Sequence, residues 1–396
     1  MPEALWRSTV EAAYPALEAF AQRLVQTPSL SGQEEEVARL VYAEMRALGY
    51  DEVWVDSVGN VWGKIAGGDG APLLFNTHMD IVDSGDVACW SRPPFGGEIA
   101  DGFLWGRGSC DAKGCLAAQV YALGLLRRAG LRPAGDVYLS AVVWEETGGL
   151  GTAHLLQTFR PAVAVIGEPS GNTLRRGHRG RTEFVLTFRG RSAHASAPER
   201  GINPHYSVAR FLLALRQVPS RPDPTFGSNS VAPTLIYAEP NSSNVIPERV
   251  TVHLDWRTIP GETRQDAEAV LADLLRHTLE PGVQASVAVR RRDVRTYTGL
   301  ERTMEYAMPG YCLAAADPLV LRARQLLEEA LGHTVEVGVW TFSTDGGQIS
   351  TAGAPCLGFG PGEEALAHVV DERLALAQLH EAVMGYMALA MGLGQS

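Results

Sequence analysis

Residues 73–80 read Leu-Leu-Phe-Asn-Thr-His-Met-Asp, a short apolar run that ends in a histidine and an aspartate. Runs of similar character occur at 137–144 and 162–166, and acidic residues follow both. Short runs that are apolar on both faces are typical of central strands in a sheet that helices cover. Helical patterns at 115–128 and 151–157 lie between these runs. The alternation of strands and helices predicts an α/β domain over about the first 170 residues.

Each of the three predicted strands is followed by polar side chains. His78 follows the first strand, Glu145 and Glu146 follow the second, and Glu168 follows the third. Open α/β sheets bind ligands in the crevice beyond the carboxyl ends of their strands. We therefore expect these four side chains to lie at the same edge of the sheet.

The chain before the first of these strands carries helix and hairpin signals. Ser31 and Glu34 have the spacing of a capping box, so we expect Ser31 to be the N-cap of a helix and Glu34 to reach back to it. Apolar residues then recur at helical spacing as far as Gly49, which is the expected end of the helix. A pair of strands is expected around Gly59-Asn60.

The pattern changes near Arg181. Four runs have strand character, at 182–189, 231–238, 250–257 and 283–290. One helix begins at Asn203-Pro204, and another begins at Thr263 with Asp266. The order strand–helix–strand–strand–helix–strand predicts a small α+β sandwich.

The α/β pattern resumes after about residue 297, so the sandwich would be an insertion into the first domain. We expect a catalytic domain over residues 1–180 and 296–396 and an inserted domain over residues 181–295. A length of 396 residues agrees with two domains, because a single core rarely grows to that size.

Composition narrows the class of protein. A content of 45% hydrophobic and 20% charged residues is typical of a globular protein in water, and the net charge of −11 argues against nucleic acid or an anionic membrane as a partner. The N-terminal residues lack the pattern of a signal peptide, and no run of about 18 apolar residues suggests a membrane span. The five cysteines have no CxxC spacing, which favours reduced thiols and a cytoplasmic location.

Two histidines and three carboxylates stand in contexts that would bring them to one point. These candidate ligands are His78, Asp111, Glu146, Glu168 and His368. Such a set suits two zinc-like ions, and a carboxylate such as Asp111 can bridge ions roughly 3.5–4 Å apart. The glycines of segment 106–114 look superficially like a phosphate loop, but their spacing matches neither GxGxxG nor the Walker motif. The sequence therefore predicts a hydrolase with two metal ions.

With these residues in place, the chain resembles the acetylornithine deacetylase / succinyl-diaminopimelate desuccinylase / aminoacylase / carboxypeptidase family of co-catalytic zinc peptidases. The resemblance covers essentially the whole chain and rests on six motifs in order: His-x-Asp after a strand, Gly-Arg-Gly-x-x-Asp-x-Lys-Gly, a Glu-Glu pair, Gly-Glu-Pro, a histidine in the inserted domain and a terminal His-x-x-x-Glu. Segments 192–201 and 340–345 also resemble a subgroup known as selenium-metabolism hydrolases, a label that assigns no substrate. Many relatives carry a Gly-Gly-Thr loop before the aspartate at 345, where this chain has Phe342-Ser343-Thr344, so the substrate of a relative does not transfer directly.

The resemblance implies a zinc-peptidase-like mixed sheet flanked by helices, with the insertion serving as a lid and dimerisation domain. It implies that the five candidate ligands bind two Zn2+ ions, for which Co2+ or Mn2+ would substitute, and that the peptide after Asp111 is cis. Asp80 would stand behind His78 and orient its imidazole. Glu145 would be the general base.

The resemblance also implies roles in the inserted domain. His194 would reach the site of the neighbouring subunit in a homodimer and stabilise the oxyanion. Arg257 would bind the carboxylate of the substrate, with help from Asn244, although an ion pair for Arg257 and a turn for Asn244 stay open as alternatives. A hinge or surface role is expected for His178, where the insertion begins.

We therefore expect a dinuclear metal-dependent amidohydrolase that cleaves a small N-acyl amino acid or a short peptide. Glu168, in place of aspartate, resembles the deacylase and carboxypeptidase branches more than the aminopeptidases. Two alternatives are a metal-binding protein of the same fold without catalysis and a nucleotide-dependent enzyme that uses segment 106–114. The presence of Glu145 argues against the first, and the glycine spacing argues against the second.

Overall fold

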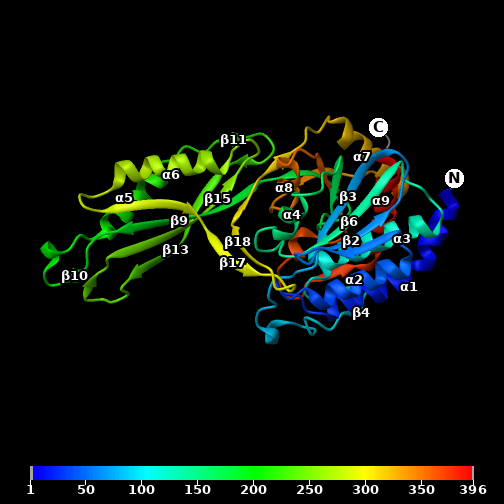
Figure 1. Ribbon diagram of the computed structural model, residues 1–396, viewed down its shortest axis with the longest axis horizontal. Coiled ribbons are helices and arrows are strands. Elements are labelled where there is room, and N and C mark those ends of the chain that lie inside the picture. Colours follow the sequence, from blue (N-terminus) through cyan, green and yellow to red (C-terminus); the bar gives the residue numbers. More distant parts are fainter. Residues whose placement is uncertain (1–2, 395–396) are drawn as a thin grey trace. The chain divides into compact units, whose positions relative to one another are not determined.

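The structure is a computed structural model that describes residues 3–394 (Figure 1). The chain forms two compact units. Unit 1 contains the described residues up to His178, then Asp293–Arg302 and the described residues from Cys312 onward. Unit 2 contains Arg179–Arg292 and Thr303–Tyr311, so it interrupts unit 1 in the sequence.

Unit 1 is built on a mixed sheet that has nine strands within the described chain, in the order β1-β2-β6-β3-β7-β22-β8-β20 with β21 beside β8. Its strands are β1 Glu52–Val55, β2 Val61–Ile65, β3 Gly70–His78, β6 Gly135–Val142, β7 Val163–Ile166, β8 Leu174–His178, β20 Tyr311–Cys312, β21 Val337–Trp340 and β22 Cys356–Gly358. β3 runs parallel to both β6 and β7, so the carboxyl ends of these three strands lie at the same edge. The predicted mixed α/β sheet is confirmed.

Helices flank this sheet. They are α1 Glu3–Gln26, α2 Glu35–Leu48, α3 Gly114–Arg128, α4 Leu150–Leu155, α7 Pro318–Leu331, α8 Gly346–Thr351 and α9 Leu376–Gly392. α3 is buried on all sides from Gly114 to Leu126, because it packs against α1, α2 and α9 as well as against strands of the sheet. A helix that is apolar all round belongs in a core, and α3 begins just after the segment that carries Asp111.

Helix α2 ends as predicted but begins differently. Gly49 closes it in the left-handed conformation, with φ +87°. The N-cap residue is Glu34, which makes no side-chain capping hydrogen bond. The predicted capping box of Ser31 and Glu34 is therefore wrong, because both side chains have partners deeper in unit 1.

Unit 2 has the predicted strand–helix–strand–strand–helix–strand order. Its antiparallel sheet follows the order β13-β15-β9-β16, with β19 beside β9. The main elements are β9 Gly180–Arg189, α5 Pro204–Leu215, β13 Ser230–Glu239, β15 Arg249–Thr258, α6 Arg264–Thr278, β16 Gln284–Val289 and β19 Ala307–Met308. Asn203 caps α5, and Thr263 with Asp266 forms a capping box on α6, as predicted.

The core of unit 2 lies between one face of its sheet and the two helices. Every second residue of β9 and β15 is buried, and the buried set includes Phe184, Leu186, Val252 and Trp256. Apart from Val185, the alternate residues of the same strands are polar or charged, so the other face of this sheet is mainly polar.

Several short elements complete the chain. They are β4 Glu98–Ala100, β5 Phe103–Trp105, β10 Ala193–His194, β11 Pro222–Asp223, β12 Gly227–Ser228, β14 Val245–Ile246, β17 Arg291–Arg295, β18 Glu301–Glu305 and β23 Arg373–Ala375. Within residues 3–394, no helix is both long enough and apolar enough to cross a membrane.

Candidate metal centre

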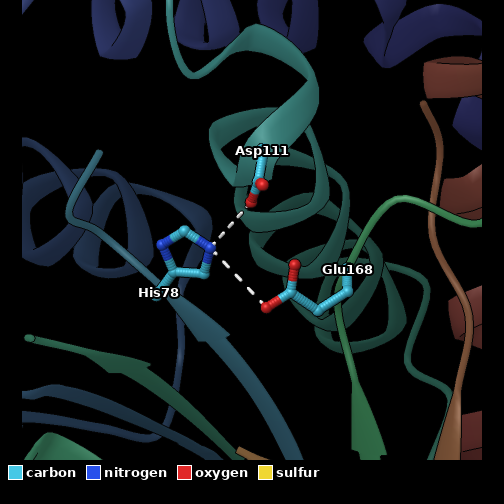
Figure 2. A group of neighbouring side chains, drawn as sticks. All are labelled: His78, Asp111 and Glu168. Atoms are coloured by element: carbon cyan, nitrogen blue, oxygen red, sulfur yellow. Dashed lines mark hydrogen bonds and ion pairs between the residues drawn. The ribbon is translucent and has the colours of Figure 1, made fainter. Parts of the chain in front are cut away.

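The edge at the carboxyl ends of β3, β6 and β7 gathers the first set of candidate ligands. His78 is the last residue of β3, and Glu168 lies two residues beyond the end of β7. Nε2 of His78 lies 3.0 Å from Oδ1 of Asp111 and 3.6 Å from Oε1 of Glu168 (Figure 2). All three side chains are buried and point toward one another, and their ligand atoms lie within 4.8 Å of one another.

A second set shares Asp111 with the first. Nε2 of His368 lies 3.2 Å from Oδ2 of Asp111 and 3.0 Å from Oε2 of Glu146. Asp111 therefore presents one oxygen to each set, which is the arrangement of a carboxylate that bridges two cations. The His368 side chain is 48% exposed, so this set opens toward solvent. The peptide from Asp111 to Ala112 is cis, as the sequence resemblance implied.

The pKa values of the two ligand sets reflect several carboxylates that are buried close to one another. Burial raises the pKa of Glu168 to about 8, and burial with the nearby Asp111 raises the pKa of Glu146 to about 7. Hydrogen bonds to Asp111 and Glu146 raise the pKa of His368 to about 10. Desolvation opposes the charged form of Asp111, but hydrogen bonds from His368 and His78 hold its pKa below the usual range. Divalent cations held by these side chains would compensate the negative charge of the crowded carboxylates.

Glu372 holds the segment that carries Asp111. Its Oε1 accepts hydrogen bonds from the main-chain N–H groups of Cys110 (2.9 Å) and Asp111 (3.0 Å), and its Oε2 accepts one from Nη1 of Arg107 (2.6 Å). Glu372 is fully buried and Arg107 is nearly so. Sequence reasoning assigned no role to Glu372, although the terminal His-x-x-x-Glu motif contains it.

Asp80 lies behind His78 with both its main-chain carbonyl and its carboxylate. Nδ1 of His78 lies 2.8 Å from the main-chain carbonyl oxygen of Asp80 and 3.6 Å from its Oδ1. A hydrogen bond from Nδ1 to the carbonyl leaves Nε2 free as the ligand atom. The carboxylate of Asp80 also accepts hydrogen bonds from the N–H groups of Glu145 (3.0 Å) and Glu146 (3.2 Å).

Glu145 belongs to neither ligand set but stands beside both. Desolvation and the neighbouring carboxylates of Glu168 and Asp345 raise its pKa well above the usual value. Asp345 is itself buried and accepts a hydrogen bond from Oγ1 of Thr152 at 2.6 Å. Sequence reasoning placed Asp345 in a family motif but missed that it adds to the charge around Glu145.

The remaining candidates lie in unit 2. His194 is exposed on β10, and its Nδ1 lies 2.8 Å from Oγ of Ser196. The main-chain oxygen of Asn244 accepts a hydrogen bond from the N–H group of Ala195, so Asn244 is beside His194. Arg257 donates from Nε and Nη2 to Asp255, at 2.6 and 3.3 Å. The ion pair that stayed open as an alternative for Arg257 is thus present.

His178, the last residue of unit 1 before the insertion, is fully buried. Its Nε2 accepts a hydrogen bond from the N–H group of Thr344 at 3.1 Å. A surface position for His178 is therefore wrong. The side chain supports the turn before Asp345.

Comparisons with known proteins agree with this geometry. The model for Peptidase family M20/M25/M40 matches residues 74–392. The uncharacterized protein YgeY of Escherichia coli K12 is 31% identical over 382 residues, which covers 94% of this chain and 93% of that protein. A succinyl-diaminopimelate desuccinylase of Rhodospirillum centenum is 30% identical over 382 residues, which covers 92% of this chain and 93% of that enzyme.

Solved structures of peptidases share the fold. The aminopeptidase PepT of Bacillus cereus superposes with a TM-score of 0.75 at 20% identity, covering 96% of this chain and 98% of that one. The YXEP protein of Bacillus subtilis, described as a dinuclear metal binding peptidase from the M20 family, gives a TM-score of 0.71 at 18% identity with 96% and 98% coverage.

The contacts of Glu372 predict a large effect on stability. Glu372→Ala should lower the free energy of unfolding by about 3–5 kcal/mol, because it leaves the buried Arg107 charge without its partner. Urea denaturation followed by circular dichroism measures this difference. The exposed Glu336→Ala, as a matched control, should change it by less than about 0.5 kcal/mol. A loss below about 1 kcal/mol for Glu372→Ala would contradict the assigned role.

Proposed function

Because the chain belongs to Peptidase family M20/M25/M40, and is thus a hydrolase of amide or peptide bonds, we propose that it is a dinuclear metal-dependent amidohydrolase. The observation that carries this proposal is the position of Asp111, whose two oxygens face two separate ligand sets. One set adds His78 and Glu168, and the other adds Glu146 and His368. A carboxylate shared between two ligand sets is typical of sites in which two cations lie close together.

The donor atoms of the two sets fit divalent ions of the zinc type. Both sets combine one imidazole nitrogen with carboxylate oxygens, and neither contains a thiol, which suits Zn2+ and also Co2+ or Mn2+. Two bound ions would supply Lewis acidity for the scissile carbonyl and would lower the pKa of water. His78, Asp111 and Glu168 would hold one ion, and Asp111, Glu146 and His368 would hold the other.

Glu145 is the proposed general base. Its carboxylate stands beside both sets without belonging to either, and its raised pKa suits a group that must take up a proton and give it back. Glu145 would remove a proton from the attacking water and later deliver it to the nitrogen of the leaving amine. Asp80 would keep Glu145 in place through the main-chain hydrogen bond at residue 145.

The proposed substrate is a small N-acyl amino acid or a short peptide. The relative from Rhodospirillum centenum removes a succinyl group, as its name states, and several proteins of the same fold are described as peptidases. Within unit 2, Arg257 would bind a substrate carboxylate with Asn244 nearby, and His194 would stabilise the oxyanion of the transition state. Arg257 would then share its guanidinium between Asp255 and the substrate.

A homodimer formed through unit 2 is part of the proposal. β13 is an edge strand of the unit 2 sheet, and it exposes Leu235 (48%), Ile236 (51%) and Tyr237 (51%). An exposed edge that is long and apolar is suited to pairing with a second chain. We also propose a cytoplasmic location, which the five free cysteines support because reducing compartments keep thiols unpaired.

Metal removal and reconstitution test the proposed function directly. Protein stripped with a chelator and reloaded should take up two divalent ions per chain and regain hydrolysis of one class among N-acetyl, N-succinyl, N-formyl and dipeptide substrates. Metal analysis and amine release are the measurements. Two bound ions without cleavage of any of these substrates would instead favour a metal-binding protein of this fold without catalysis.

Glu145→Gln tests the general base. The variant keeps the size of the side chain but cannot accept a proton, so kcat should fall by roughly 100-fold to 10,000-fold while both ions stay bound. Steady-state kinetics and metal analysis on the same preparation check both parts. A kcat within about threefold of the wild-type value would remove Glu145 from the mechanism.

Mixing two inactive variants tests whether His194 acts across a dimer. His194→Ala alone should lower kcat by roughly 100-fold to 1,000-fold. After subunit exchange with Glu145→Gln, about half of the dimers are hybrids, and each hybrid has one intact site, so roughly one quarter of the wild-type activity should return. Activity that stays absent after proven exchange would contradict a role for His194 in the partner's site.

A further inference from the structure

The turn that carries Glu145 is held by three consecutive main-chain N–H groups. Trp144 donates to Oε1 of Glu34 (3.2 Å), and Glu145 and Glu146 donate to Oδ1 and Oδ2 of Asp80 (3.0 and 3.2 Å). Both acceptor side chains are fully buried. Two carboxylates thus set the direction in which the backbone leaves β6 and presents the side chain at position 145.

The segment Ser31–Glu34 is shaped to reach this turn. Oε1 of Glu34 also accepts a hydrogen bond from the N–H group of Gly32 (2.9 Å), and Oγ of Ser31 donates to Oδ2 of Asp80 (2.6 Å). Gly32 has φ +91°, and a Cβ atom there would lie 2.8 Å from the indole ring of Trp144. Ser31 and Glu34, which resemble a helix cap in the sequence, therefore pack around the turn. Glu34 accepts a hydrogen bond from the turn directly, and Ser31 donates to Asp80, the other carboxylate that accepts from the turn.

Trp144 needs such support because its own conformation is unfavourable. It has φ +58°, in the left-handed region that bulky side chains rarely adopt. Its N–H group donates the hydrogen bond that Glu34 accepts, and Trp144 directly precedes the proposed base in the sequence. Without that acceptor, residue 144 has less to hold it in the left-handed region, and the carboxylate at residue 145 moves with it.

A glutamate at position 34 is also not the side chain that packing alone would favour. Within residues 3–394, its Oε2 is buried without a hydrogen-bond partner. A buried oxygen in that state lowers stability, so a side chain that served only to fill space would be better as an apolar residue. The position of Glu34 is therefore better explained by what its Oε1 does.

We propose that Glu34 is a positioning residue for the hydrolytic reaction, which acts by holding the N–H group of Trp144 and thereby aiming the Glu145 carboxylate. This inference rests on the proposed function, because it takes Glu145 as the general base. Ser31 acts on the same turn indirectly, because it donates a hydrogen bond to Asp80, which holds the N–H groups of Glu145 and Glu146.

Two substitutions of nearly equal length separate the acceptor from the rest of the side chain. Glu34→Met removes the acceptor and should lower kcat by roughly 10-fold to 100-fold, with KM and the number of bound ions unchanged. The thermal unfolding midpoint should fall, because the N–H groups of Gly32 and Trp144 lose their acceptor, which outweighs the removal of the unpaired Oε2. Glu34→Gln keeps an oxygen at Oε1 and should stay within roughly threefold of the wild-type kcat. Glu36→Met, on the solvent side of α2, is the matched control and should match the wild type.

Hydrogen exchange provides a reading that does not need activity. Amide exchange in a peptide covering residues 144–146 should speed up in Glu34→Met and stay slow in Glu34→Gln, whereas the peptide covering β3 should be unchanged. If the wild type hydrolyses no substrate, this measurement still decides whether Glu34 holds the turn, so failure of the proposed function is recognised separately.

Three results would overturn the inference. They are a wild-type kcat in Glu34→Met, equal losses in the Met and Gln variants, and unchanged exchange at residues 144–146. If Glu34→Met does not fold, Ser31→Ala takes its place, since it deletes only one hydroxyl from the same segment. A fall in kcat of roughly threefold to 10-fold at constant KM then supports the inference, and an unchanged kcat overturns it.

Discussion

The structure depends on placing several carboxylates around one point out of water, where each needs hydrogen bonds or positive charge in return. The five candidate ligands face one another across the shared Asp111. Behind them stands a second layer formed by Glu372, Asp80 and Glu34, whose oxygens accept mainly from main-chain N–H groups. The inner layer is thus arranged for cations, and the outer layer holds the backbone that bears it.

The register of the sheet determines where the residues that follow each strand lie. β3 and β6 pair in parallel so that His78 lies opposite Val142, and β7 pairs so that Ile166 lies opposite Asn76. The residues just beyond these positions therefore emerge side by side, although they are far apart in the chain. A sheet edge defined by hydrogen-bond register tolerates little displacement, because each step along a strand also turns the side chain to the other face.

Much of the fold and the ligand sets follow from local pattern. The apolar strands, the change of pattern at the insertion and the polar residues after each strand are all visible in the sequence, and the structure brings His78, Asp111 and Glu168 together as expected. The two errors, at Glu34 and His178, and the omission of Glu372 share one cause. The side chains of Glu34, Glu372 and His178 bind main-chain groups of distant segments, and a side chain that binds a distant backbone leaves no periodic signal in the sequence. Spacing alone therefore assigned Glu34 to a local helix cap.

The contacts of Glu372 also set the order in which this protein can be completed during synthesis. Nearly all of unit 2 comes from one continuous stretch, Arg179–Arg292, so its core can close while the rest of the chain is still being made. The segment around Asp111, by contrast, needs Glu372 for its main-chain hydrogen bonds, and the second ligand set is complete only with His368. Both residues come late in the sequence. A nascent polypeptide can therefore carry a folded insertion before the segment around Asp111 has gained its contacts with Glu372 and His368.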